Sequence, residues 1–336
     1  MKPADVIWSG YALDYYKSQT GQMKKLALSL LALIVILGFS FGCASGHTPT
    51  PHPDTLPAAT EPPTAPVPSP TLASPPESPS PPTPAQGELK VHFIDVGQGD
   101  ATLLQGPDFT IVIDAGRHDR SDVVPYLKSA GVKSIDLLIG THPHADHIGQ
   151  FPQVIEAFPV GEVWLSGDTT TTRTFERAID AIEASDAGYH EPRAGETFNF
   201  GSARIEVLNP DHLTGELHEG SIGVRIVYGS FTVLFTGDAE AETEMAILAR
   251  KYDVNALILH LGHHGSSTSS SAEFLKAVNP EVAVYSAAKD NSYGHPHEVV
   301  LERLRQMGVQ IYGTDVNGTI MVITDGQTYE VQAQRR

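Results

Sequence analysis

The chain has 336 residues, of which 40% are hydrophobic and 18% are charged, and it contains one cysteine. A single cysteine excludes an internal disulfide, a zinc site built on several cysteines and a cysteine-ligated iron–sulfur cluster. The formal net charge is −18, which makes the chain a poor non-specific nucleic-acid binder unless metal ions or a local basic patch intervene.

The first 43 residues have the pattern of a targeting segment rather than of a folded domain. Lys24 and Lys25 precede an apolar run at 26–41, which is followed by Cys43 and small residues. This order is typical of a secretory signal, with Met23 as the predicted true start. Acylation of Cys43 would make the mature chain a lipoprotein. The alternative is an uncleaved anchor helix, although a run of 16 residues is slightly short for a membrane span.

Residues 44–87 differ from the rest of the chain in composition. Positions 48–87 contain 15 prolines and 11 Ser or Thr residues but no Lys or Arg. Such a segment cannot bury a hydrophobic core, and it favours extended, polyproline-like backbone. We therefore predict a disordered stalk that holds the following domain away from a surface.

Residues 88–336 are expected to form one α/β domain with a net charge of −17, since they carry 18 Lys and Arg against 35 Asp and Glu residues. Short β-rich runs predict strands at 89–96, 101–105, 110–113, 135–140, 160–165, 203–208, 223–228, 232–236, 256–260 and 282–286, with a strand pair from Gln310 onward. Helical patterns lie at 121–130, 174–184, 240–251, 272–277 and 298–307. Two sheets sandwiched between helices fit this order better than one parallel sheet.

The strongest chemical signal is the run THPHADH at 141–147, directly after the predicted buried strand 135–140. It places three imidazoles, of His142, His144 and His147, and the Asp146 carboxylate within six residues. The spacing lets the first two histidines face one metal ion while Asp146 and His147 face another. Imidazole and carboxylate ligands suit Zn²⁺, Mn²⁺ or Fe²⁺. A solvated histidine-rich loop is the alternative.

This run and the motifs around it resemble, in their order along the chain, those of the metallo-β-lactamase superfamily. Asp238 in FTGD matches the metal-bridging Asp of that family, and the histidine pair in LGHHGS matches its last ligand. Asp114 in IDAG matches the Asp that braces the ligand loop. The resemblance covers essentially all of 88–336, and it implies an αββα four-layer sandwich.

Two ligand positions stay open in this resemblance. The family usually has another histidine before the bridging Asp, and His218, 20 residues before Asp238, is our candidate, with His212 as a weaker alternative. His263 and His264 are adjacent, and adjacent side chains on an extended segment point opposite ways. We therefore expect one of the two to bind metal and the other to bind substrate.

Two further motifs narrow the resemblance to one branch of the family. FIDVGQGDA at 93–101 opens the domain, and NSYGHPH at 291–297 follows strand 282–286. They resemble the hydrolase domain of ComEC-type competence proteins, a branch that often lacks the additional histidine. The glycines of the first motif allow a tight turn or a close approach to the site, and a purely structural hairpin is the alternative. We expect His295 and His297 to be candidates for donating to a phosphate or acting as general acid. A structural role is an equal alternative for His297, because we expect the two rings to face apart on an extended loop.

The resemblance implies two divalent metal ions, zinc first and manganese as the alternative, which can hold a bridging hydroxide for in-line attack on phosphorus. The predicted metal ligands are His142, His144, Asp146, His147, His218, Asp238 and His263. The predicted catalytic residues are Asp146, Asp238, His264 and His295.

The resemblance implies a metal-dependent hydrolase, first of all a phosphodiesterase or nuclease acting on a phosphodiester such as DNA. The charge and the lack of a basic run favour a small phosphodiester, such as a phosphorylcholine ester, as an alternative. A β-lactamase or lactonase, or a non-catalytic binding module, are further alternatives. No protein partner is predicted. We expect the chain at the extracellular face of the membrane, anchored at Cys43, or else secreted or signal-anchored.

Overall fold

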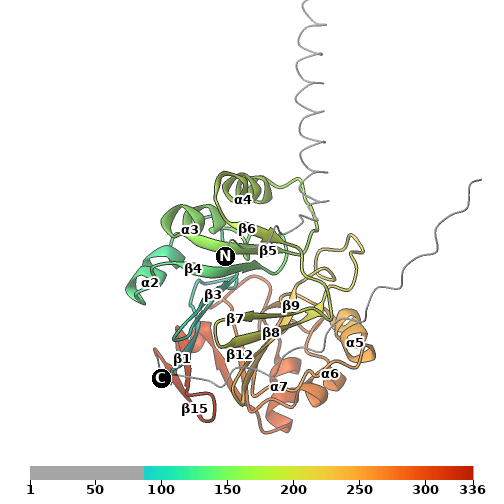
Figure 1. The fold of residues 1–336 in the computed structure, drawn as a ribbon. Coiled ribbons are helices and arrows are strands. Elements are labelled where there is room, and N and C mark those ends of the chain that lie inside the picture. Colours follow the sequence, from blue (N-terminus) through green and yellow to red (C-terminus); the bar gives the residue numbers. More distant parts are fainter. Residues whose placement is uncertain (1–86, 336) are drawn as a thin grey trace, which may run out of the picture. The chain divides into compact units, whose positions relative to one another are not determined.

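The structure is a computed structural model that describes residues 87–335, in which 15 strands form two β-sheets (Figure 1). The predicted signal segment, the stalk and Cys43 lie outside the described residues, so those predictions stay predictions. Within 87–335 every helix is too short or too polar to cross a membrane.

The first sheet has eight strands and changes from antiparallel to parallel pairing at β3. Its order is β15-β14-β1-β2-β3-β4-β5-β6, with parallel pairing from β3 to β6 and antiparallel pairing elsewhere. Its strands are β1 (Leu89–Phe93), β2 (Thr102–Gln105), β3 (Thr110–Ile113), β4 (Ile135–Gly140), β5 (Val160–Leu165), β6 (Gly188–His190), β14 (Ile320–Thr324) and β15 (Tyr329–Ala333).

The second sheet repeats this arrangement with seven strands. Its order is β13-β12-β11-β10-β9-β8-β7, and pairing is parallel from β10 to β13. Its strands are β7 (Thr197–Phe200), β8 (Ala203–Asn209), β9 (Gly223–Tyr228), β10 (Phe231–Phe235), β11 (Ile258–His260), β12 (Val282–Tyr285) and β13 (Gln310–Gly313). In both sheets the parallel half brings several strand ends to the same edge.

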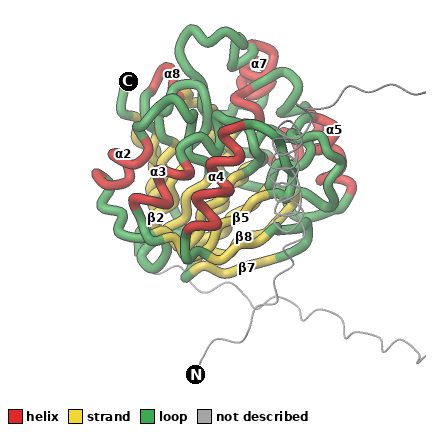
Figure 2. Tube along the Cα trace, turned by 90° about the horizontal axis from the view of Figure 1, so that it is seen from above, coloured by secondary structure: helices red, strands yellow, loops and turns green. Residues whose placement is uncertain are grey.

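Helices connect the parallel strands, as parallel pairing requires. Figure 1 shows one set beside β4, β5 and β6 and the other on the opposite side of the sandwich, and Figure 2 shows α3 and α4 lying over strands. The first set is α2 (Val123–Ser129), α3 (Phe151–Ala157) and α4 (Arg173–Ala184), and the second is α5 (Ala241–Ala249), α6 (Ala272–Val278) and α7 (Glu298–Gln306), with the short η1 (Gly262–Gly265) and α8 (Thr314–Asn317). The predicted αββα sandwich is confirmed.

Strand β10 illustrates why several strands are apolar along their whole length. Val233 and Phe235 belong to the core between the two sheets. Leu234, which points to the opposite face, packs in a second core with Phe274 of α6 and Leu304 of α7. A strand covered on both faces has no solvent side, so the alternation of polar and apolar residues disappears.

The structure corrects the predicted elements in three places. The region after Gln310 holds three strands rather than a pair, because β13 joins β12 in the second sheet while β14 and β15 form a hairpin beside β1. The sequence analysis missed helix α3, which has seven residues and a proline in its first turn. It also missed β6 and β7, whose three and four residues are too short for a clear period.

Candidate metal centre

The chemically distinctive residues gather where the parallel strands end. Asp114 follows β3, His142 follows β4, Asp238 follows β10 and His264 follows β11. Residues at the carboxyl ends of neighbouring parallel strands share one edge of a sheet, and ligands in α/β proteins bind at such edges. The two sheets face each other, so their ends together form one site. The backbone N–H of Ile222 donates to the carbonyl of Thr141 (2.8 Å) and joins the two sheets there.

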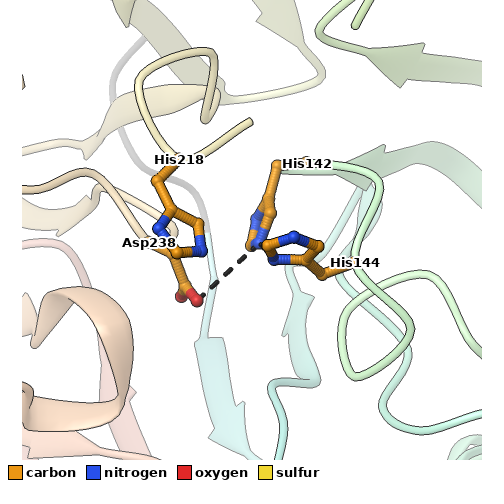
Figure 3. A group of neighbouring side chains, drawn as sticks. All are labelled: His142, His144, His218 and Asp238. Atoms are coloured by element: carbon orange, nitrogen blue, oxygen red, sulfur yellow. Dashed lines mark hydrogen bonds and ion pairs between the residues drawn. The ribbon is translucent and has the colours of Figure 1, made fainter. Parts of the chain in front are cut away.

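The first of two side-chain groups is the outer group, His142, His144, His218 and Asp238, with one ligand atom of each within 4.8 Å of the others (Figure 3). His142 Nε2 lies 3.7 Å from Asp238 Oδ2 and 2.9 Å from His144 Nδ1. The rings of His144 and His218 are 4.9 Å apart. His142 and Asp238 are buried, whereas His144 and His218 are half-buried.

His218 reaches this group from a loop that is fixed at both sides. The Asn209 amide nitrogen, at the end of β8, donates to the carbonyls of Glu219 (2.7 Å) and Ser221 (2.8 Å). The Ser221 hydroxyl in turn accepts from the backbone N–H of Asp238 (3.2 Å). His212, the alternative candidate, has a side chain that is 74% exposed and pairs with Asp211, and it belongs to neither group.

The second group is the inner group, Asp100, His147, Asp238 and His264, all of them buried. His147 Nε2 lies 3.3 Å from Asp238 Oδ1, and His264 Nε2 lies 3.8 Å from Asp238 Oδ2. Asp146 lies at the rim of this group, with Oδ2 3.3 Å from His264 Nε2. Asp238 is therefore shared by both groups, as expected of a carboxylate between two ions.

Asp114 fixes the orientation of the inner group from behind. Its carboxylate accepts hydrogen bonds from the Thr141 backbone N–H, the Thr141 hydroxyl and His147 Nδ1, each at 2.8 Å. Because Nδ1 of His147 faces this carboxylate, Nε2 faces Asp238. A carboxylate behind a ligating histidine is a common partner in metal sites, since it fixes the tautomer and the ring plane.

Four buried atoms of the inner group test whether these residues fit a metal ion. Asp238 Oδ1, His147 Nε2, His264 Nε2 and Asp100 Oδ1 all lack a hydrogen-bond partner. A buried polar atom without a partner costs about 1–3 kcal/mol. His147 Nε2 and His264 Nε2 both face the Asp238 carboxylate, so these atoms need a common partner. A divalent cation that accepts nitrogen and oxygen ligands supplies it, and the donor set therefore fits the implied metal.

The charges of the inner group shift its protonation. Burial opposes a charge on His147, but Asp238 and Asp114 outweigh it and raise the pKa of His147 well above its ordinary value. Likewise Asp238 and Asp100 outweigh burial and raise the pKa of His264. The pKa of Asp238 is lowered, since His147, His264 and His142 outweigh its burial. Burial lowers the pKa of His142 and keeps that imidazole neutral. Metal binding to the inner group must therefore displace protons.

The expectation that His263 and His264 lie on an extended segment is wrong. Both residues have left-handed backbone, with φ of 51° and 55°. Such conformations cost about 1–3 kcal/mol each for residues other than glycine, and they are typically held in place at functional sites. The turn points both rings to the same side: His263 Nε2 lies 3.7 Å from Asp238 Oδ2. His264 belongs to the inner group, whereas His263 belongs to a half-buried set with His218 and Glu240.

Asp100 is the functional candidate that the sequence analysis missed. Gly99 has φ of +134°, and a Cβ there would clash with the Asp146 carbonyl oxygen. The close approach lets the Asp100 backbone N–H donate to that carbonyl (3.1 Å) and brings its carboxylate into the inner group. Of the two interpretations of the glycine motif, close approach is the one observed. The available signal was an acidic residue that directly follows the two glycines.

Two further residues support the groups without having been predicted. His260, the last residue of β11, places Nε2 3.0 Å from the Ser286 hydroxyl and 3.5 Å from Asp100 Oδ1. Glu240 Oε1 lies 3.5 Å from His218 Nδ1 and 3.4 Å from His263 Nδ1. Glu240 therefore stands behind the half-buried histidines as Asp114 stands behind His147.

The loop after β12 brings His295 beside the inner group. The His295 ring lies 5.5 Å from that of His263 and 6.0 Å from that of His264, and its buried Nδ1 has no hydrogen-bond partner. His297 Nδ1 accepts from the backbone N–H of Ser267 (2.8 Å), which is a structural contact. The expectation that the two rings face apart is wrong, because they are in edge contact at 5.0 Å.

The chain has sequence relatives among competence proteins of ComEC type. The chain is 32% identical over 240 residues to competence protein ComA of Neisseria gonorrhoeae, covering 70% of this chain and 32% of that protein. It is 31% identical over 261 residues to recombination protein 2 of Haemophilus influenzae, covering 73% of this chain and 30% of that protein. It is 28% identical over 253 residues to ComE operon protein 3 of Bacillus subtilis, covering 69% of this chain and 33% of that protein. The chain thus spans about a third of the length of these relatives, which are competence proteins of ComEC type.

Among solved structures, the chain is similar to YhfI, a metallo-β-lactamase fold protein of Bacillus subtilis. The sequence identity is 16% and the TM-score is 0.47, and the match covers 68% of this chain and 96% of YhfI. The sequence pattern of the metallo-β-lactamase superfamily matches residues 94–289, the segment that contains both side-chain groups. The chain therefore belongs to the metallo-β-lactamase superfamily, as a metal-dependent hydrolase whose clustered His and Asp side chains suit divalent ions.

Proposed function

We propose that this chain is a phosphodiesterase that cleaves DNA with two divalent ions held by the outer and the inner group. The observation that carries the proposal is the shared Asp238, whose carboxylate faces His142 of one group and His147 and His264 of the other. Two ions bridged by one carboxylate can stabilise both the attacking and the leaving oxygen of an in-line displacement at phosphorus.

The DNA substrate is supported by the relatives. One of them is called a competence protein, one a recombination protein and one a ComE operon protein. These names belong to proteins about three times as long as the matched region, and they describe the whole of those proteins. The DNA substrate of this chain is therefore our proposal. The match to the superfamily at residues 94–289 covers the region that holds both groups.

We assign the ligands from the geometry. His142, His144 and His218 would hold the outer ion, and Asp100, His147 and His264 the inner one, with Asp238 between them. His264 thus replaces His263 as the proposed ligand, because His264 is buried within the inner group. Asp146 remains a proposed ligand at the rim, beside His264. The imidazole-rich outer group favours Zn²⁺ over Mn²⁺.

Bound ions of this kind lower the pKa of a coordinated water and polarise a phosphoryl oxygen. The residues of the chain prepare the site for that chemistry. Asp114 and Glu240 orient imidazoles, and His263 lies where it can contact the substrate. Burial and neighbouring histidines lower the pKa of His295 to about 4. His295 is therefore neutral at pH 7, and we assign it a hydrogen bond to a phosphate oxygen rather than the role of general acid.

A second candidate is a small phosphodiester with a cationic group, such as a phosphorylcholine ester. A cavity of about 580 Å³ lies beside His144 and His218 and is lined by Glu216, Glu219, Glu240 and Glu242. Carboxylates repel the phosphates of a long polyanion, and they attract a cation. This cavity is the observation that favours the second candidate.

One experiment separates these candidates. The full-length chain, purified in detergent with Zn²⁺, Mn²⁺ or EDTA, is given DNA, p-nitrophenyl phosphorylcholine and nitrocefin as alternative substrates. We expect metal-dependent cleavage of DNA that is lost in His144→Ala and kept in the matched control His212→Ala, whose side chain is exposed and belongs to neither group. Cleavage of the choline ester alone would move the assignment to the second candidate, and cleavage of nitrocefin alone would contradict both.

We also propose that the chain is a lipoprotein at the extracellular face of the membrane. The proposal rests on the basic start, the apolar run at 26–41 and the single cysteine that follows it. Metabolic labelling with a radioactive fatty acid should mark the wild-type chain and leave Cys43→Ala unlabelled. Labelling of both, or of neither, would contradict acylation at Cys43.

A further inference from the structure

The loop between β12 and α7 exposes an aromatic side chain beside the metal centre. Tyr293 is 63% exposed, which is high for so large an apolar ring. Its ring stacks on that of His295, with centroids 5.6 Å apart and an angle of 22° between the planes. His295 in turn lies 5.5 Å from the ring of His263. Tyr293 therefore contacts His295 and still exposes more than half of its surface, beside the proposed phosphate site.

The loop that carries Tyr293 is held in shape by its own hydrogen bonds. The Asn291 side-chain oxygen accepts from the backbone N–H groups of Tyr293 and His295, each at 3.1 Å. The Asn291 amide nitrogen donates to the carbonyls of Ala288 (2.9 Å) and His295 (2.5 Å). A ring presented on an ordered loop loses little entropy when a ligand stacks on it.

A polar group next to Tyr293 suits the phosphate of the same ligand. The His295 ring lies between the ring of Tyr293, at 5.6 Å, and that of His263, at 5.5 Å. His295 is 9% exposed, and its Nδ1 has no hydrogen-bond partner. An exposed aromatic ring beside a polar ring nitrogen matches the base and the phosphate of a nucleotide.

We infer that Tyr293 stacks on an unpaired nucleobase of the strand whose phosphodiester lies at the metal centre. The inference rests on the proposed DNA cleavage and adds a substrate class, single-stranded nucleic acid. A base in a duplex has both faces covered by its neighbours, so it cannot stack on a protein ring unless it leaves the helix. Stacking on one ring is tolerant of sequence, because every base has a π-face. Tyr293 therefore selects for single-stranded over double-stranded nucleic acid and not for a particular base.

The test compares a thymidine oligonucleotide with an abasic oligonucleotide of the same length, which keeps the phosphodiesters and lacks the bases. Binding to the full-length chain is measured by fluorescence anisotropy in EDTA at low ionic strength, so that no hydrolysis occurs. We expect the wild-type chain to prefer the base-bearing strand. Tyr293→Ala should weaken binding of that strand between about five-fold and 150-fold and remove the preference. Tyr293→Trp should retain it, and the matched control Tyr252→Ala, at another exposed tyrosine, should behave as wild type.

Three results would overturn the inference. The wild-type chain could show no preference for the base-bearing strand, or Tyr293→Ala could keep that preference unchanged. Tyr293→Ala could also weaken binding of the base-bearing and the abasic strand equally. Because binding is measured without metal, this test is separate from that of the proposed function. A chain that prefers the base-bearing strand through Tyr293 but cleaves no DNA with Zn²⁺ or Mn²⁺ would contradict the proposed function alone.

Discussion

The inner and the outer group share Asp238 but differ in how they are held. All four members of the inner group are buried, and Asp114 contacts His147 at 2.8 Å from behind. In the outer group His144 and His218 are half-buried, and Glu240, which stands behind His218 at 3.5 Å, is itself 39% exposed. Water competes for the outer contacts and is excluded from the inner ones.

This difference separates two tasks. Ligands fixed by buried hydrogen bonds lose little freedom when they bind an ion, so the inner group is prepared for tight binding. The outer group opens to the cavity lined by Glu240 and Glu242, so solvent reaches its ligands. We therefore expect the inner ion to bind more tightly and the outer ion to exchange more readily with solution.

The largest effect is expected from removing the residue that both groups share. Asp238→Asn keeps the size of the side chain but loses the charge that faces His142, His147 and His264. Activity should fall by more than the 10–100-fold that loss of an outer partner typically costs. Metal analysis of the purified variant should show both ions reduced. A variant that retains one full equivalent of tightly bound metal would contradict the sharing.

Asp114→Asn tests the brace of the inner group alone. Asparagine tolerates left-handed backbone, which matters because Asp114 has φ of 58°. The amide has one acceptor oxygen where the carboxylate offers two, so His147 loses its charged partner. We expect a loss of about 10–100-fold in affinity for the tighter ion, measured by competition with a chromogenic chelator. A loss confined to the weaker ion would reverse our assignment of the two groups.

The stability and the metal affinity of the inner group should both depend on pH. His147 and His264 have raised pKa values in the metal-free chain. Their stabilising contribution is complete below the ordinary value of about 6.5 and disappears as pH rises through the raised values. Meanwhile, metal affinity at the inner group should rise about tenfold per pH unit for each displaced proton. The gap in Tm between the Zn²⁺-loaded and the EDTA-treated chain should therefore widen from about pH 6 to about pH 9, as calorimetry can check. A constant gap would mean that these histidines carry no proton in the metal-free chain.

The smallest effect is expected from Glu240→Gln, at the brace of the outer group. Glutamine keeps a hydrogen-bond acceptor beside His218 and His263, and the exposed position screens the lost charge. We expect affinity for the weaker ion to fall by only about two- to five-fold, below the range for buried partners, with the tighter ion unchanged. Glu242→Gln is the matched control, since Glu242 lines the same cavity. Equal losses in both variants would indicate a general charge effect instead of positioning.

Much of the fold was predictable because it depends on local patterns. The predicted strand at 223–228 coincides with β9, and the predicted strands at 101–105 and 110–113 correspond to β2 and β3, which pair with each other. Buried strands produce continuous apolar runs and helices produce a longer period, and both can be read without tertiary information. The partner of each strand was not predictable in the same way: β13 and β14 are close in the chain but belong to different sheets.

The candidate site likewise has a part that was predictable from the sequence and a part that was not. The sequence by itself determined that His142, His144 and His147 lie close together, since residues within six positions of one another must meet at one strand end. Only the tertiary structure brought in Asp100, which comes from the loop after β1. It also decided between His218 and His212, because His218, which precedes β9 in the opposite sheet, reaches the outer group and His212 does not. Only the tertiary structure turned both rings of the His263–His264 pair toward Asp238, through left-handed backbone that no residue pattern signals. The physical reason is that spacing along a chain fixes which side chains share one element, whereas the packing of two sheets decides which elements share one ion.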